Sequence, residues 1–343
     1  MPKLTVAVTG PTGDIGRSLL RALERSRDVG RIRAMARSPF DPAAEGLRKT
    51  EYRQADVLDA DAVAEVIAGA DVVVHLAFVI MGDIEETTSV NLQGSRNVFA
   101  ATVQAGAARL VYTSSVAAYG FGADNPELLT EDLEPRGTRR HYYSAQKAEL
   151  ELTLRELLDG TGTGTGTGTE AYVFRPCIVA GPDAPALLEA IPYLQISEKL
   201  PAAMLRALEL LPVLKPVIPD PGVPFQLVHH DDVALALRAA VLGRGEPGIY
   251  NLAGDGTVSM SELARALGWY SLPVPDLALG AAAELVARLP FVPAEAQWIE
   301  SLRRPVLMDT TRARRLLRWR PRHDAHETLT DMVTAARSAS LIR

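Results

Sequence analysis

The first half of the chain alternates short runs of β-branched residues with segments whose apolar positions recur every three or four residues. Strand-like runs stand at KLTVAVTG, RIRAMAR, DVVVHLAF, RLVYTSS and EAYVFRP, and helical periods such as DIGRSLLRALERS, DAVAEVIAG and VNLQGSRNVFAATVQAG lie between them. This alternation is typical of βαβ units. The pattern therefore predicts an α/β fold with a doubly wound parallel sheet.

The second half changes character near residue 183, where proline becomes frequent and the pattern turns helical and apolar. The segment FQLVHHDDVALALRAAVLG then returns a strand and a helix, GIYNLAG one more strand, and VSMSELARALGW a helix with Ser259 or Ser261 as its N-cap. We therefore expect a discontinuous sheet domain, residues 1–182 plus about 227–253. The remainder, about 183–226 plus 254–343, is expected to form a smaller substrate-binding region.

Composition narrows the function classes. The chain has 343 residues, 47% of them hydrophobic, and a formal net charge of −6, which argues against a nucleic-acid-binding surface. A single cysteine, Cys177, excludes an internal disulfide and suits a reducing compartment. The N-terminus reads directly as a strand, and apolar stretches are broken before the ~18 residues of a membrane span. We expect a cytoplasmic protein without a membrane span.

A repeat of glycine and threonine, GTGTGTGTGT at residues 160–169, precedes the strand EAYVFRP. It has no side chains that pack, and it lacks the Lys-Ser/Thr ending and following helix of a phosphate-binding loop. We interpret it as a connecting loop without a chemical role.

A glycine-rich turn, TGPTGDIG at residues 9–16, joins the first expected strand to the first expected helix. Gly10, Gly13 and Gly16 recur every three residues, which differs from the best-known G-x-G-x-x-G spacing. Glycines here allow a tight turn and let the backbone approach a pyrophosphate at the helix N-terminus. The turn predicts a dinucleotide-binding site.

Arg37 follows the second expected strand, with Arg33 and Ser38 near it, and no carboxylate stands there. An acid at this place binds the ribose 2′-hydroxyl of NAD, whereas an arginine favours the 2′-phosphate of NADP. We therefore expect NADP, with NAD possible. Asp56 and Val57 are expected beside the adenine, and residues 75–77, including Leu76 and Ala77, on the ribose side.

Several ordered segments together resemble the extended short-chain dehydrogenase/reductase superfamily, the NAD(P)-dependent epimerase/dehydratase group. They are TGPTGDIG, ADVLD, VVVHLAF, YTSSVAAYG, YYSAQK, FRPCIVAGP, LVHHDDVA, GIYNLAG and LLRWRP, and they extend over nearly the whole chain. The resemblance implies a Rossmann-type domain that binds NAD(P). It places further cofactor contacts along the glycine turn and at the end of the last strand: Thr12, Asp14, Ile15 and Pro176.

The resemblance also implies a catalytic set of serine, tyrosine, lysine and asparagine. The matching residues are Ser115, Tyr143, Lys147 and Asn91; Ser114 is the alternative serine, and Asn91 equally suits a helix cap. A free phenol has a pKa near 10, so an ammonium four residues along a helix is expected to favour its ionised form. Tyr143 would then act as general acid or base, and Ser115 would bind the substrate oxygen.

The substrate-side segment between residues 184 and 216 is apolar, with Lys199, Arg206 and Lys215 as its cations. Cys177 and Ile178 stand where many nucleotide-sugar enzymes of the group carry an asparagine. We therefore expect an oxidoreductase acting on a hydroxyl or carbonyl of a moderately hydrophobic small molecule. Two alternatives remain: a nucleotide-sugar epimerase or dehydratase, for which Arg303 and Arg304 would receive a diphosphate, and a non-catalytic NAD(P)-sensing protein.

Two further expectations concern partners and metals. The resemblance implies a homodimer that pairs helices near residues 91–105 and 143–158 into a four-helix bundle, and the stripe Val98, Ala101, Ala105 suits either that interface or burial against the sheet. His229 and His230 precede two aspartates. Because the sequence shows no third ligand, we interpret them as a structural pair and expect no metal.

Overall fold

The computed structural model describes residues 2–80, 84–159, 168–189, 191, 216–274 and 305–339. The chain folds into two compact units. The first contains residues 1–177, 231–252 and 308–320, and the second contains residues 178–230, 253–307 and 321–343. None of the described helices is long and apolar enough to cross a membrane.

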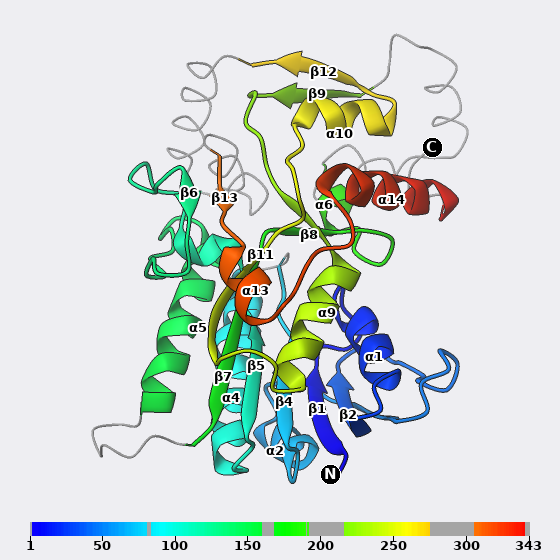
Figure 1. Ribbon diagram of the computed structural model, residues 1–343, viewed down its shortest axis with the longest axis vertical. Helices are drawn as coiled ribbons and strands as arrows, with labels where there is room; N and C mark the ends of the chain where they lie inside the picture. Colours follow the sequence, from blue (N-terminus) through cyan, green and yellow to red (C-terminus); the bar gives the residue numbers. More distant parts are fainter. Residues whose placement is uncertain are drawn as a thin grey trace. The chain divides into compact units, whose positions relative to one another are not determined.

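The first unit is built on a parallel sheet, as the alternating pattern predicts. Among the described residues, seven strands pair in the order β11-β7-β5-β4-β1-β2-β3 (Figure 1). All six pairings are parallel. The strands are β1 (Leu4–Thr9), β2 (Val29–Ala36), β3 (Thr50–Gln54), β4 (Val72–His75), β5 (Arg109–Thr113), β7 (Glu170–Pro176) and β11 (Gly248–Leu252).

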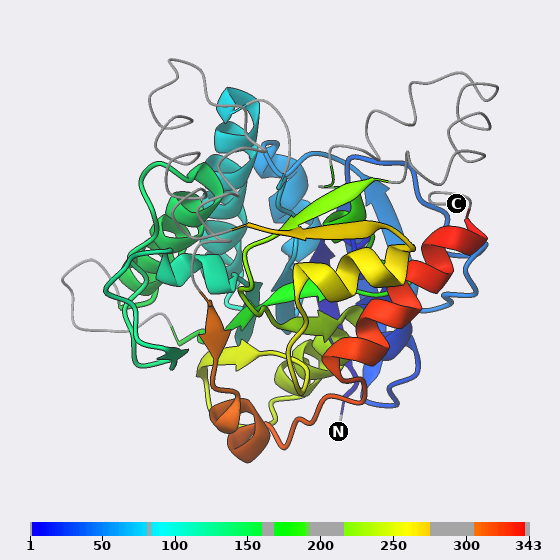
Figure 2. The same cartoon turned by 90° about the horizontal axis from the view of Figure 1, so that it is seen from above.

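The central strands of this sheet are buried on both faces, which explains their continuous apolar runs. In β1, the consecutive residues Val6, Ala7 and Val8 are each 0% exposed. One face packs against α2 (Ala60–Ile67), α4 (Gly94–Gln104) and α5 (Tyr142–Asp159) in a single apolar cluster. The opposite side carries α1 (Gly16–Glu24) and α9 (His230–Val241) (Figures 1 and 2).

Short elements cover the edges of the first unit. They are α3 (Ile84–Thr88), the π-helical turn η1 (Ser89–Gln93), the 3₁₀ turn η2 (Val116–Tyr119), β6 (Leu128–Leu129), β13 (Leu307–Met308) and α13 (Thr311–Leu316). The segment 308–320, expected with the smaller region, instead belongs to the first unit. Trp319 is 4% exposed, and its indole N–H donates to the carbonyl of Asp232 at 2.8 Å.

Most of the stripe on α4 that was considered for a dimer interface is buried in the core. Val98 and Ala101 are buried in the cluster under the sheet, while Ala105, just past the helix, is exposed. On the outer surface, Arg96 of α4 pairs with Glu149 of α5 at 2.6 Å. Two of the three stripe residues are therefore explained by burial within one chain, and the homodimer stays a prediction.

The second unit has its own apolar core. Two parallel strand pairs, β8 with β10 and β9 with β12, pack in this core with the helices α6, α10 and α14. Their bounds are β8 (Ile178–Ala180), α6 (Ala186–Glu189), β9 (Val217–Asp220), β10 (Leu227–His229), α10 (Met260–Leu267), β12 (Tyr270–Pro273) and α14 (Ala325–Ser338). Of the two cap candidates for α10, Ser259 is the N-cap and forms a capping box with Glu262.

Candidate active site

The glycine turn between β1 and α1 is tightly packed at two of its three glycines. Gly10 has φ +74°, and an added Cβ would lie 2.6 Å from the backbone nitrogen of Ala77 after β4. A Cβ on Gly16 would clash with the carbonyl of Gly10. Only glycine satisfies both the backbone angle and these close approaches, so the turn holds the ends of β1 and β4 together.

Gly13 has the opposite surroundings. It is exposed, and an added Cβ would meet only the carbonyl oxygen of Gly10 at 3.7 Å. Ile15, the N-cap of α1, makes no side-chain capping bond, and the first turn of α1 holds no acidic residue. Thr12 and Asp14 are half-buried beside it. An open backbone at the N-terminus of a helix whose first turn holds no acidic residue fits a pyrophosphate.

The adenosine-side residues lie beyond the ends of β2 and β3. Arg37 follows β2 and is exposed, and its carbonyl accepts a bond from the Gln54 amide at 2.8 Å. Arg33, in contrast, sits within β2 and donates to the carbonyl of Ala68, which removes it from this edge. Val57 is buried against Gly94, and Asp56 accepts the Leu58 amide at 3.0 Å. Of the two arginines, Arg37 therefore stays the expected partner of a 2′-phosphate.

His75, at the end of β4, is a structural residue. Its Nδ1 lies 2.7 Å from the hydroxyl of Thr9 and its Nε2 lies 2.8 Å from the hydroxyl of Ser95. Burial, together with the charge of Lys147, lowers the pKa of His75 to about 3. Both ring nitrogens are thus engaged inside the protein. Leu76 and Ala77, the next two residues, remain the members of this segment that face the glycine turn.

We expect the neutral state of His75 to make the protein sensitive to acid. Its pKa is about 3 in the folded chain, against 6.5 for an unperturbed imidazole, so the unfolded chain binds more protons between these pH values. Stability is therefore fully present above pH ~6.5 and falls by up to ~1.4 kcal/mol per pH unit below it. Between pH 7 and pH 5 the urea midpoint of unfolding should decrease less in His75→Asn than in wild type. The variant His326→Asn, which changes an exposed histidine, should show the same decrease as wild type. Equal drops in wild type and His75→Asn would contradict the assignment.

Ser115 and Tyr143 meet at the carboxyl edge of the sheet. Ser115 lies close enough to Tyr143 to lower the pKa of its phenol, and the two side chains are 7% and 8% exposed. Ser115 also caps η2 by accepting the Ala117 amide at 3.2 Å. The alternative serine is directed elsewhere, because the Ser114 hydroxyl donates to Glu151 at 2.5 Å. The adjacent Tyr142 donates its hydroxyl to the carbonyl of Ile80.

The electrostatics of Tyr143 and Lys147 are dominated by burial. Burial raises the pKa of Tyr143 to about 12, against an opposing contribution from the Ser115 hydrogen bond. Burial likewise lowers the pKa of Lys147 to about 7, while the charge of Glu151 opposes the change. The sequence-based expectation was a phenol ionised by its lysine. The protein alone instead holds a neutral phenol, which is a proton donor at neutral pH.

Lys147 is held between the strand end and an aromatic ring. Its Nζ donates to the carbonyl of Thr113 at 2.9 Å and lies 3.7 Å from the centroid of the Phe78 ring. Phe78 also packs edge-on against Tyr143, with centroids 5.4 Å apart. Sequence reasoning did not single out Phe78. Its position three residues after β4, at the edge where the other site residues converge, is the signal that would have found it.

A buried ion pair lies one turn behind Lys147. Arg175 of β7 donates through Nη2 to Glu151 at 2.5 Å and through Nε at 2.9 Å, and the two side chains are 0% and 3% exposed. The guanidinium also lies 4.3 Å from the centroid of Tyr119. Pro176, the other residue expected here, ends β7 opposite Leu252. This network connects β7 to helix α5, and the sequence pattern did not predict it.

Asn91 uses its amide to fix the loop after β4. Its Oδ1 accepts the Val79 amide at 2.8 Å, and its Nδ2 donates to the Val79 carbonyl at 2.9 Å and to Gln146 at 2.8 Å. It is 0% exposed. With these bonds Asn91 positions the loop that carries Phe78 relative to α5, and it does not cap a helix.

Several expectations fall outside the described residues. They concern the glycine-threonine repeat over 160–167 and the cations Lys199, Arg206, Lys215, Arg303 and Arg304.

Comparisons with known proteins agree on the family and on the fold. The model of the NAD dependent epimerase/dehydratase family matches residues 6–253. A human relative, 3 beta-hydroxysteroid dehydrogenase type 7, is 36% identical over 157 residues, which are 43% of this chain and 42% of that protein. Sterol demethylase protein B of Methylococcus capsulatus is 29% identical over 182 residues, 51% of this chain and 55% of the relative.

The matched part of the chain thus spans about half the length of these curated relatives. Among solved structures, UDP-glucuronic acid 4-epimerase from Bacillus cereus, in complex with NAD, superimposes with a TM-score of 0.70. The match covers 98% of this chain and 99% of that one at 17% identity. At this identity the likeness establishes the fold, a Rossmann-type parallel sheet.

Proposed function

Because the chain belongs to the NAD dependent epimerase/dehydratase family, we propose that it is an NAD(P)-dependent oxidoreductase acting on a hydroxyl or carbonyl carbon. The observation that carries this proposal is the burial of Ser115, Tyr143 and Lys147 together at the carboxyl edge of the sheet, with Lys147 one helical turn from Tyr143. The substrate is a moderately hydrophobic small molecule. Two relatives whose names refer to sterols support that class.

The residues of the chain have separate roles in this reaction. Ser115 hydrogen-bonds the substrate oxygen, and Tyr143 donates a proton to that oxygen as a carbonyl is reduced, or accepts it as an alcohol is oxidised. The glycine turn and α1 would hold the pyrophosphate, and Lys147 would contact the nicotinamide-side ribose. When bound, the cofactor supplies or accepts the hydride. Phe78 and the buried helix face exclude water from the phenol.

The alternative is a nucleotide-sugar epimerase or dehydratase, in which the cofactor is regenerated within one turnover. The family description itself favours keeping this candidate. The purified chain should be incubated with NADH or NADPH and a panel of steroid and aliphatic ketones, and separately with NAD⁺ and UDP-sugars. Net loss of absorbance at 340 nm with ketones supports the oxidoreductase. If chromatography shows that UDP-sugars are converted while the cofactor undergoes no net change, the epimerase or dehydratase is the correct function and the oxidoreductase is rejected. Cofactor binding without turnover of either panel would favour a sensing role.

We infer a preference for NADP from Arg37. Arg37→Ala should weaken NADPH binding roughly 10- to 150-fold, because a charged hydrogen bond to a phosphate is worth about 1.5–3 kcal/mol, and leave NADH binding unchanged. Fluorescence titration measures both. Arg33→Ala is the matched control, since Arg33 donates to the Ala68 carbonyl. Equal effects of Arg37→Ala on the two cofactors would refute the preference and leave the oxidoreductase assignment intact.

A further inference from the structure

Three side chains from distant parts of the sequence meet in the second unit. His229 ends β10, His323 precedes the N-cap of α14, and Asp331 lies in the second turn of α14. A ring nitrogen from each histidine and a carboxylate oxygen of Asp331 all lie within 4.8 Å of one another. We propose that these three residues bind a zinc-class divalent cation.

The distances suit such a cation after small side-chain adjustments. Zinc bonds to histidine nitrogen and carboxylate oxygen are about 2.0–2.2 Å long, so tetrahedral ligand atoms lie about 3.4 Å apart. The present limit of 4.8 Å therefore requires movements on the order of 1 Å. His229 is 3% exposed, whereas His323 and Asp331 are partly exposed. The adjustment therefore falls to these two side chains, and His323 must turn out of its stack on His229 to make it.

The surrounding backbone makes room for the two imidazoles. The rings of His229 and His323 are stacked, with centroids 4.0 Å apart. Gly181, just after β8, has φ +129°, and an added Cβ would lie 2.9 Å from Nε2 of His229. A glycine here leaves the space that the His229 ring occupies. The neighbouring His230 has another role, because its Nε2 accepts the Asp183 amide at 3.1 Å.

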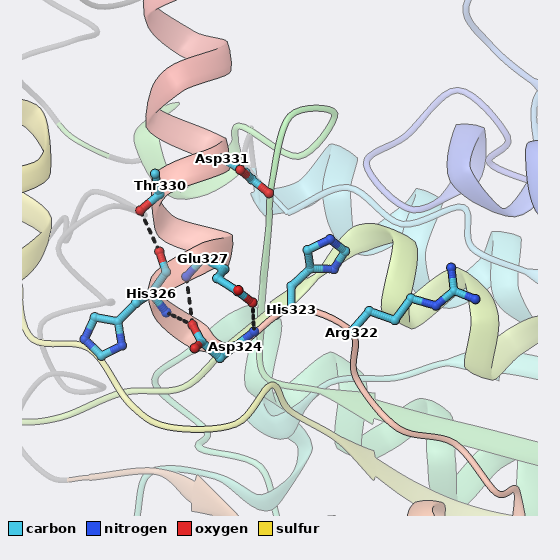
Figure 3. Close-up of a pocket in the computed structure, with 7 residues that line it drawn as sticks. All are labelled: Arg322, His323, Asp324, His326, Glu327, Thr330 and Asp331. Carbon is cyan, nitrogen blue, oxygen red and sulfur yellow. Dashed lines mark hydrogen bonds between the residues drawn. The ribbon is translucent and has the colours of Figure 1, made fainter.

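His323 and Asp331 also line an open cavity of about 400 Å³ (Figure 3). Its wall carries three carboxylates, Asp324, Glu327 and Asp331, and one guanidinium, Arg322, so the lining favours a cation. His326 lines the same cavity, but Figure 3 shows that it points away from His323. It pairs with Glu262 at 3.0 Å.

Two nitrogens and one oxygen form a donor set that suits zinc better than magnesium or calcium, which prefer all-oxygen sites. Three protein ligands leave a fourth position for water from the cavity. The cation would fasten the start of α14 to β10. Two of the ligands lie beyond residue 253, where the family match ends, so the site is a feature of this chain's C-terminal part.

Zinc binding to the untagged, chelator-treated full chain tests the proposal. Isothermal titration with ZnCl₂ should give one site, and zinc should raise the midpoint of thermal unfolding. His323→Gln and Asp331→Asn should each weaken binding by more than ~10-fold, since loss of a ligand costs at least as much as loss of its outer-shell partner. His326→Gln, on the same cavity, should bind zinc as wild type does.

A cobalt titration gives a second measurement, because Co²⁺ in a tetrahedral site absorbs strongly in the visible range. Wild type and His326→Gln should show that band, and the two ligand variants should not. Circular dichroism of the metal-free variants verifies that each is folded. The proposal is overturned if wild type takes up no zinc, or if both ligand variants bind it as wild type does.

Discussion

Tyr143→Phe is expected to lower kcat for carbonyl reduction by roughly 10²–10⁴-fold, the usual contribution of a positioned general acid. The phenylalanine keeps the packing against Phe78 but removes the only proposed proton donor to the substrate oxygen. Dinucleotide affinity should change little. Steady-state kinetics with a ketone identified in the screen, together with cofactor titration, separates the two effects.

Tyr142→Phe is the matched control for this variant. The Tyr142 hydroxyl donates to the carbonyl of Ile80, so its removal should alter kcat by no more than a few-fold. The pH profile gives an independent check. Because burial raises the pKa of Tyr143 to about 12, alcohol oxidation should accelerate as the pH rises towards alkaline values, where more phenolate forms. Full activity in Tyr143→Phe would eliminate the proposed mechanism.

Arg175→Leu is expected to destabilise the fold by about 3–5 kcal/mol, because it leaves the Glu151 carboxylate buried without its partner. The guanidinium makes two of its bonds to that carboxylate at 2.9 Å or less, inside a region where both side chains are almost fully buried. Urea unfolding at pH 7 measures the change. The double variant Arg175→Leu with Glu151→Leu should recover much of the loss, since no charge then remains unpaired.

The exposed pair Arg155–Glu134 offers a control on the same helix α5. These side chains are 45% and 65% exposed, so Arg155→Leu should cost no more than about 1 kcal/mol. A similar cost for Arg175→Leu and Arg155→Leu would show that the buried pair does not stabilise the sheet-to-helix contact as described.

The elements that sequence predicts well are those whose signal is local. Alternating strand and helix patterns predict a parallel sheet, because successive βαβ units place their strands in one sheet in the same direction. The family suggested by the glycine turn and the Tyr143–Lys147 spacing was confirmed, and the model match begins at residue 6. A capping box is likewise visible in SMSE, where the structure selects Ser259 over Ser261.

Features that depend on contacts between remote residues were not predictable from the sequence alone. Nothing near Glu151 indicates that Arg175, 24 residues later and on a strand, completes its ion pair. The pKa of Lys147 is lowered because its side chain is buried beside Phe78, and the spacing of residues in the sequence does not reveal that contact. His323 and Asp331 lie about a hundred residues beyond His229, so a search for nearby ligands could not connect them.

The return of residues 308–320 to the first unit has a consequence for the architecture of the gene. The chain passes between the two units after residues 177, 230, 252, 307 and 320. Neither unit is encoded by one uninterrupted stretch, so neither can be exchanged with a homologue as a single cassette. Replacing one unit by its counterpart from a homologue therefore requires several separate segments to be exchanged together.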